Sequence, residues 1–288
     1  MCFFEMLDAN ALVRNHPQSA RILKTGNSDR GKIAGQILGR DPGMMLEAAG
    51  ELQKYAKISF LDINAACPAK KVIKKKAGAY LLEDAGTLQK ITKNLTRNLK
   101  IPVTIKLRTG FDKKDVPNIQ RVARMCEDTG ISAIFIHGRT RASGYSGDID
   151  YESIRAVKET VKLPVFGSGN IFGALSAGRM LDETGCDGVL VARGAMGNPW
   201  IFDEIKKFLR TGRMREKPAP AEKKRELKRH LGYIQKYKEL RHSDKSGFMG
   251  KVAMWYLKGF PRAKRLRGEI GKIKTYKDLM ELVNSISA

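Results

Sequence analysis

The chain has 288 residues and a formal net charge of +24, from 54 Lys and Arg against 30 Asp and Glu. A chain of this length can bury a large core in one or two domains, and a hydrophobic fraction of 42% excludes a disordered basic tail. The excess of positive charge is greater than solubility requires, so it indicates a polyanionic partner, with nucleic acid as the first candidate.

Four cysteines, Cys2, Cys67, Cys126 and Cys186, lie far apart and form no C-x-x-C pair. This spacing disfavours a zinc site or a disulfide framework and is typical of a reducing compartment. The sequence contains neither a run of 18 apolar residues nor a signal-peptide pattern. We therefore expect a soluble, cytoplasmic protein with no membrane partner and no metal.

Apolar runs of strand length alternate with segments of helical spacing as far as about residue 211. Strands are predicted near 2–6, 33–38, 58–63, 102–108, 132–137, 164–167 and 187–192, and helices over 44–56, 85–99, 117–129, 151–161, 173–184 and 199–211. This alternation predicts βαβ units and a parallel sheet. No G-x-G-x-x-G opens a helix after a strand, and polar residues end most strands, so a (β/α)8 TIM barrel is favoured over a dinucleotide-binding sheet. A closed barrel needs eight strands, and seven are found.

The character of the chain changes near residue 213. Lys217-Pro218-Ala219-Pro220 resembles a linker, and helical spacing over 221–240, 247–258, 261–271 and 275–286 predicts a small helical bundle. Residues 213–288 carry 21 Lys and Arg against 8 Asp and Glu, a net of +13, whereas the first 212 residues carry +11. We predict a barrel domain over 1–212 and a basic helical domain over 213–288. The aromatic residues of the second domain are expected in its core rather than stacked on bases: Tyr233, Tyr237, Trp255, Tyr256 and Phe260.

The stretch from Ile58 to Asp84 concentrates the chemistry. An apolar strand over 58–63 is expected to break at Asn64 into a small-residue loop that carries Cys67 beside Pro68. Five lysines follow it: Lys70, Lys71, Lys74, Lys75 and Lys76. A thiol and dense positive charge at a strand end indicate chemistry beside a polyanion. The alternatives are a small buried hydrophobe for the cysteine and a solvated face for the lysines.

The strand near 102–108 alternates apolar with polar side chains. Its polar set, Thr104, Lys106 and Arg108, is expected to face the barrel interior. A lysine in that interior is costly unless it has an anionic or hydrogen-bonding partner. Two alternatives stay open: Lys106 pairs with a neighbouring acid such as Asp62, or it faces a bound electron-rich group at the barrel mouth.

His137 ends the next strand, with Phe135 and Arg139 on the same side. A single histidine is weak evidence, because a satisfied structural histidine is the usual outcome. Only four His are present and no acidic cluster accompanies this one, so metal binding is not expected.

Small residues follow the last two strands at the points where each turns toward a helix. The two turns are Ser168-Gly169-Asn170 and Ala192-Arg193-Gly194. Free backbone N–H groups at such turns bind phosphate, and barrels commonly place a phosphate site after strands seven and eight. Glycines that serve only the turn are the alternative. Two consecutive turns, one with an arginine, favour the phosphate site.

Several long motifs in the same order resemble those of the tRNA-dihydrouridine synthases, flavin enzymes that reduce particular uridines in tRNA. DINAACPAKKV is similar to the family's active-site signature D-I-N-x-G-C-P, and VTIKLRTGFD, IHGRTRASGYSG and VARGAMGNPWIF to its later barrel signatures. HLGYIQKY and MWYLKGFPRAK resemble its C-terminal helical domain. The resemblance covers almost the whole chain.

The resemblance implies an FMN-containing barrel in which NADPH recharges the flavin, hydride passes to carbon 6 of the uracil, and a cysteine thiol protonates carbon 5. Cys67 falls on the catalytic cysteine. Flavin contacts are assigned to Gln36, Lys106 and His137, phosphate contacts to Ser168, Gly169, Asn170, Ala192 and Arg193, and tRNA contacts to Asn64, Lys70, Lys71, Arg139 and Arg141. The uridine must leave its stack, so the enzyme must grip a folded RNA by its phosphates and shape.

The sequence departs from the family pattern at several places. Ala66 replaces a glycine before the cysteine, Ser168 and Asn170 replace Asn and Asp, and Ala192 stands where Gly is frequent. Residues 1–6 join the family pattern in its second strand, which accounts for the strand count. From the missing first strand and helix we expect weak FMN binding and low stability, both restored by an upstream segment.

Two other functions remain as alternatives. One is an FMN barrel that reduces a free pyrimidine or another small molecule, which would not need a basic helical tail. The other is an RNA-binding homologue that has lost catalysis. We favour a monomeric FMN-dependent tRNA-dihydrouridine synthase that uses NADPH.

Overall fold

The structure is a computed structural model that describes residues 2–14, 16, 33–238, 242–258, 260 and 262–286. The chain forms two compact units. The first comprises Met1–Asn170 and Arg179–Leu190, and the second comprises Ile171–Gly178 and Val191–Ala288. The domain boundary that the sequence predicts after residue 212 stays a prediction.

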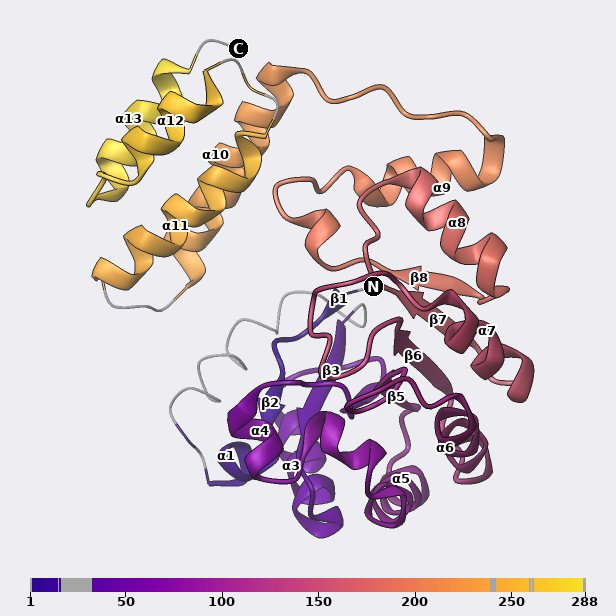
Figure 1. Cartoon of the computed structure of the whole chain (residues 1–288). Helices are drawn as coiled ribbons and strands as arrows, with labels where there is room; N and C mark the ends of the chain where they lie inside the picture. Colours follow the sequence, from indigo (N-terminus) through magenta and orange to yellow (C-terminus); the bar gives the residue numbers. More distant parts are fainter. Residues whose placement is uncertain are drawn as a thin grey trace. The chain divides into compact units, whose positions relative to one another are not determined.

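A parallel sheet forms the centre of the first unit (Figure 1). Its order is β1-β3-β4-β5-β6-β7-β8, and β2 lies beside β3. The strands are β1 (Cys2–Phe3), β2 (Leu7–Asp8), β3 (Ile33–Leu38), β4 (Leu61–Asn64), β5 (Val103–Arg108), β6 (Ala133–His137), β7 (Val165–Ser168) and β8 (Gly188–Leu190). Within the described residues, β8 pairs only with β7, and β1 and β2 pair only with β3. The expected parallel α/β architecture is confirmed.

Aromatic rings inside the curve of the sheet show how strongly it bends. Phe3 of β1 lies 5.3 Å from Phe135 of β6 between ring centroids, although three strands separate β1 from β6 in the sheet order. Phe60 and Phe166 stack on Phe135 at 6.3 Å and 5.0 Å. A flat sheet could not bring these rings together, so the strands curve as in a barrel wall.

Helices follow the strands and begin in the same way. α3 (Pro42–Tyr55), α5 (Ala85–Asn98), α6 (Val116–Asp128) and α7 (Tyr151–Thr160) each start after an aspartate. Asp41, Asp84, Asp115 and Asp150 each accept a hydrogen bond from the backbone N–H three residues on, at 2.7–3.1 Å. Such an N-cap satisfies a backbone donor that the helix cannot. The repeated aspartate therefore fixes where each helix leaves its loop.

The local path between β3 and the lysine run differs from the prediction. β4 starts at Leu61 rather than residue 58, and it includes Asn64, the expected break. Of the strand predicted at 2–6, only Cys2–Phe3 forms a strand, β1, and the separate β2 begins at Leu7. The short helices α1 (Ala9–Val13) and α4 (Lys70–Lys74) and the 3-10 helix η1 (Gly78–Leu82) were not predicted. In α4 only Val72 is buried and most of the other residues are lysines, so no periodic spacing of apolar residues marks this helix in the sequence.

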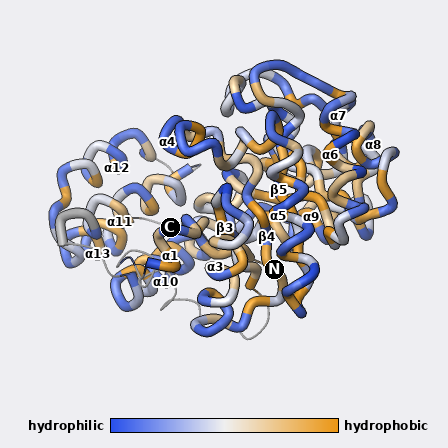
Figure 2. The backbone as a smooth tube through the Cα atoms, turned by 90° about the horizontal axis from the view of Figure 1, so that it is seen from below, coloured by the Kyte–Doolittle hydropathy of each residue, from blue (hydrophilic) through white to orange (hydrophobic). Residues whose placement is uncertain are grey.

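In the second unit, Ile171–Gly178 includes the first residues of α8 (Ala174–Thr184). After Leu190 the chain forms η2 (Arg193–Ala195), α9 (Ile201–Thr211), α10 (Pro220–Tyr237), α11 (His242–Tyr256), α12 (Ala263–Ile270) and α13 (Tyr276–Ser285). In Figure 2 much of α12 is hydrophilic blue. The expected C-terminal helices are confirmed. Residues 239, 240 and 261 of the predicted helices lie outside the described residues.

The core of these helices contains only part of the expected aromatic set. Tyr256 and Phe260 are buried, and Trp255 packs partly against the core. Tyr233 and Tyr237 were expected there and are instead 55% and 54% exposed. The buried stripe of α10 consists of Leu227, Leu231 and Ile234. Tyr233 and Tyr237 lie roughly 130° and 90° around the helix from the centre of this stripe, because successive helical residues are about 100° apart.

Candidate active site

The polar residues at the carboxyl ends of the strands in the first unit come together through the register of the sheet. Gln36 of β3 lies opposite Asp62 of β4, and Asn64 lies opposite Lys106 of β5. His137 of β6 lies opposite Ser168 of β7 in the same way. Parallel strands place their carboxyl ends at one edge, which is where barrels hold their sites.

A series of hydrogen bonds joins polar side chains of β3, β4 and β5. Asp62 is fully buried and accepts from Thr104 Oγ1 at 2.7 Å and from Gln36 Nε2 at 2.7 Å. Gln36 Oε1 then accepts from Asn64 Nδ2 at 2.8 Å. An ionised carboxylate can only accept. Asp62 therefore orients the Gln36 amide, and the Gln36 amide orients that of Asn64.

The Asn64 amide, at the end of this series of hydrogen bonds, fixes the turn that carries the Cys67 thiol. Asn64 Oδ1 accepts from the backbone N–H groups of Ala66 at 3.1 Å and Cys67 at 2.9 Å. The Cys67 carbonyl accepts from Ala79 N at 3.1 Å. Gly78 has φ +62°, and a Cβ there would lie 2.9 Å from the Cys67 carbonyl oxygen. Cys67 is partly exposed, so its thiol sits on a turn held from both sides and within reach of solvent.

Lys106 is partly buried beside this network. Its Nζ donates to Ser168 Oγ at 3.3 Å, and Ser168 Oγ donates to the Ile136 carbonyl at 3.1 Å. Burial lowers the pKa of Lys106 to about 8, although the negative charge of Asp62 acts to raise it. Burial likewise raises the pKa of Asp62 to about 6, and the hydrogen bonds from Thr104 and Gln36 act to lower it. Each group offsets part of the cost of burying the other.

Arg108 braces the same turn, a role that the sequence did not reveal. It is 3% exposed, and its Nε donates to the Ala66 carbonyl at 2.7 Å. Its Nη1 donates to the carbonyls of Thr140 at 2.9 Å and Gly144 at 3.2 Å. Burial lowers the pKa of Arg108. The only signal in the sequence was the alternation that placed Arg108 on the interior side with Lys106.

Arg139 and Arg141, assigned to tRNA contacts, lie on the loop after β6. Arg139 is 4% exposed and donates from Nη2 to the Gly147 carbonyl at 2.5 Å and from Nη1 to Asn170 Oδ1 at 3.4 Å. Arg141 is paired with Asp112, and its guanidinium lies 4.3 Å from the Phe111 ring centroid. Both guanidinium groups thus engage neighbouring loops of the chain.

The turn after β7 has a backbone that only small residues permit. Gly169 has φ +132°, and a Cβ there would lie 2.4 Å from Ile149 Cδ1. Asn170 has φ +50°, in the left-handed region that asparagine tolerates. The His137 ring lies 6.5 Å from that of Tyr145. Ser168 of this turn accepts a hydrogen bond from Lys106 Nζ, so the turn lies close to that cation.

The remaining candidates lie elsewhere. Lys70 and Lys71 begin α4 and are exposed. Ala192 and Arg193 belong to the second unit, where the Arg193 guanidinium lies 5.4 Å from the Phe172 ring centroid. A Cβ on Gly194 would lie 2.1 Å from the Ile171 carbonyl oxygen, so this turn packs closely against the loop that precedes α8.

Comparison with known proteins identifies the family. The dihydrouridine synthase family model matches residues 1–287. The chain belongs to the dihydrouridine synthase family. Similar relatives are tRNA-dihydrouridine synthase B of Pseudomonas aeruginosa, 36% identical with 95% of this chain and 81% of the relative covered, and that of Vibrio cholerae, 37% identical with 96% and 84% covered. The expected resemblance and the expectation of an oxidoreductase are confirmed.

The donor groups of this dihydrouridine synthase fit an FMN group. Lys106 would supply a partly buried cation for the electron-rich edge of a flavin ring, with Asn64 opposite it in the sheet. The Ser168–Asn170 turn would suit a phosphate, because it follows a strand and has positive φ angles at Gly169 and Asn170, and turns of this kind present N–H groups to anions. Within the described ranges, no group of three or more His, Cys, Asp or Glu could hold a metal ion. No helix there is long and apolar enough to cross a membrane.

Proposed function

We propose that this protein reduces the 5,6 double bond of particular uridines in tRNA, with FMN as its cofactor and NADPH as the reductant. The observation that carries the proposal is the Cys67 turn, which Asn64 anchors; Asn64 lies opposite the partly buried Lys106 in the sheet. When bound, FMN supplies the hydride for carbon 6 of the uracil. A small-molecule reductase would need the same groups but not the charge of +24.

Cys67 is the proton donor in this proposal. Its thiol delivers a proton to carbon 5 of the uracil as carbon 6 is reduced, and the resulting thiolate regains a proton from water. A general acid must lie within reach of the atom it protonates. The hydrogen bonds from Cys67 N and Ala66 N to Asn64 Oδ1 hold the thiol-bearing turn in one conformation.

Lys106, Gln36, His137 and the Ser168–Asn170 turn hold the cofactor in this proposal; Ala192 and Arg193 belong to the second unit, and their assignment to the phosphate stays a prediction. The cation of Lys106 favours negative charge on the flavin ring, and the turns take its phosphate. Residues 213–288 grip the tRNA through their net charge of +13, with Lys70 and Lys71 near the thiol. Because mature tRNA is its substrate, we place the enzyme in the cytoplasm.

The test is an assay of dihydrouridine in tRNA that lacks the modification, with FMN and NADPH present. The parent should form dihydrouridine and carry a visible flavin spectrum. Cys67→Ala should keep that spectrum and lose product formation, whereas Cys2→Ala, which removes an exposed thiol, should behave as the parent. Full turnover by Cys67→Ala would refute the assignment of the proton donor.

A further inference from the structure

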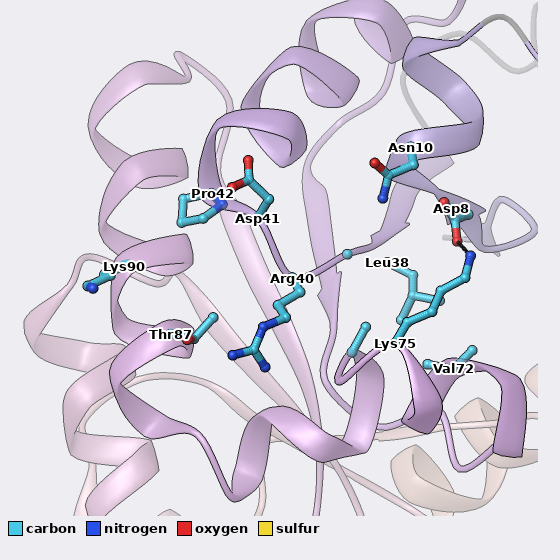
Figure 3. A pocket seen from close by; sticks show the side chains of 12 residues that line it. Asp8, Asn10, Leu38, Arg40, Asp41, Pro42, Val72, Lys75, Thr87 and Lys90 are labelled. Carbon is cyan, nitrogen blue, oxygen red and sulfur yellow. Dashed lines mark hydrogen bonds and ion pairs between the residues drawn. The ribbon is translucent and has the colours of Figure 1, made fainter.

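A second cavity lies in the first unit, at the carboxyl ends of β2 and β3 (Figure 3). Its volume is about 430 Å³, within the range of small-ligand pockets. The N-terminus of α3, the end of α4 and the first turns of α5 complete its walls. None of the residues assigned above to the cofactor or to the thiol lines it.

The lining combines both signs of charge with an apolar floor. The cations are Arg40, Lys75 and Lys90, the carboxylates are Asp8 and Asp41, and the floor consists of Leu38, Val72 and Ala77. A simple anion would be repelled by the two carboxylates. A ribonucleotide matches both sets, because its phosphate suits the cations, and carboxylates bind ribose hydroxyls elsewhere in proteins.

The charged groups can be rearranged around a ligand at small cost. Lys75 Nζ lies 3.1 Å from Asp8 Oδ2, but the two side chains are 64% and 31% exposed, so their pair contributes little. Arg40 donates from Nη2 to Asp84 and from Nη1 to the Lys76 carbonyl. Its guanidinium has further N–H groups that can donate to a ligand. Lys90 is exposed, and it forms no ion pair within the described residues. Figure 3 shows Arg40 between Lys90 and the Asp8–Lys75 pair.

The floor of the cavity also supports the thiol. Leu38, Val72 and Ala77 form one buried cluster, and Cys67 packs against the same cluster. A nucleotide bound against these three residues would therefore lie on one side of the apolar cluster, with Cys67 on the other. This places the cavity next to the reacting uridine without being part of its pocket.

We propose that this cavity binds a ribonucleotide of the tRNA that neighbours the reduced uridine. The phosphate faces Lys75 and Lys90, and the ribose 2′-hydroxyl faces Asp8. The proposal rests on the proposed function, because it takes tRNA as the substrate. A nucleotide bound here anchors the strand beside the extruded uridine, and its 2′-hydroxyl distinguishes RNA from DNA.

The first experiment compares two substitutions on one helix. Lys90→Gln removes a cation that lines the cavity, whereas Lys93→Gln removes an exposed cation of α5 that does not line it. Lys90→Gln and Lys75→Gln should each raise the KM for tRNA about tenfold with kcat and flavin content unchanged. Each should also lower the slope of log affinity against log salt by about 0.7 to 0.9. Equal KM values for Lys90→Gln and Lys93→Gln would overturn the proposal.

Direct binding separates this proposal from the proposed function. The full chain is titrated with a labelled RNA trinucleotide, with DNA of the same sequence, and with uridine monophosphate. We expect the RNA to bind several-fold tighter than the DNA, and Lys90→Gln to weaken RNA binding while Lys93→Gln does not. This result in a chain that forms no dihydrouridine would support the site and refute the activity. Equal affinity for RNA and the free nucleotide would overturn the assignment to tRNA.

Discussion

Two regions of the molecule use positive charge in opposite ways. Lys106 is a partly buried cation of the first unit, with a lowered pKa and a hydrogen bond to Ser168. The C-terminal helices instead carry many exposed cations, and residues 213–288 have a net charge of +13. Coulomb interactions are strong in a buried site and screened at the surface. We therefore expect the position of each charged group to matter in the first region, whereas in the second the sum of the charges matters most.

The largest effect should come from the buried carboxylate that orients the amides. Asp62→Leu removes the acceptor of Gln36 Nε2, so Gln36 and Asn64 lose the interaction that orients their amides, and Asn64 Oδ1 is no longer held toward Cys67 N. A broken buried hydrogen bond costs about 1–3 kcal/mol, so kcat should fall roughly tenfold to a hundredfold. The measurement is dihydrouridine formation at saturating tRNA with flavin content checked.

Thr104→Val is the matched control for Asp62→Leu, because it removes the other hydrogen bond of Asp62 and keeps the acceptor of Gln36 Nε2. It should lower stability and leave kcat within about twofold. The pKa of Asp62 is raised to about 6, so the carboxylate gains a proton as the pH falls through that value. Activity of the parent should fall over the same range. Parent-like kcat in Asp62→Leu would refute the orienting role.

The next effect concerns Lys106 and the cofactor. Lys106→Met should weaken FMN binding at least tenfold near pH 7, because the partly buried cation is lost. Since the pKa of Lys106 is lowered to about 8, the parent loses this cation as the pH rises through that value. The ratio of the parent's affinity for FMN to that of Lys106→Met should therefore shrink from about pH 7 to about pH 9. A ratio that does not change with pH would show that the charge of Lys106 is not what binds FMN.

Exposed cations of α10 should each have a smaller effect. Arg225→Gln and Lys236→Gln should weaken tRNA binding a few-fold and lower the salt slope by about 0.7 to 0.9 for each phosphate that the protein no longer neutralises. Lys57→Gln, an exposed cation before β4, is the control and should bind as the parent does. Unchanged affinity in the α10 double variant would remove this helix from the proposed RNA surface.

The smallest effect is expected at the two exposed tyrosines. Tyr233→Ser and Tyr237→Ser should change the free energy of unfolding by less than about 0.5 kcal/mol, because both rings project into solvent. Phe260→Ala, which removes a buried ring of the same unit, should cost about 3–5 kcal/mol. Thermal unfolding curves measure both. If the tyrosine variants also weaken tRNA binding, the two rings stack on bases and contribute to RNA binding together with the charged residues of this region.

Some of this architecture could be predicted because it depends on near neighbours in the chain. Alternation marked the strands from β3 to β8, and aspartates before α3, α5, α6 and α7 cap those helices. The prediction failed where spacing was hidden or ambiguous. Lysines obscured α4, and an aromatic count placed Tyr233 and Tyr237 in a core that their helical phase excludes.

The sequence by itself determined the parallel α/β order, the basic C-terminal helices and the candidate thiol, because hydrophobic periodicity, charge and motifs are local properties. Only the tertiary structure decided that Asp62 orients Gln36 and Asn64, that Arg108 braces the Ala66 carbonyl, and that Leu38, Val72 and Ala77 join the Cys67 turn to a second cavity. These contacts join residues up to 42 positions apart. They depend on strand register and loop path, which no local pattern specifies.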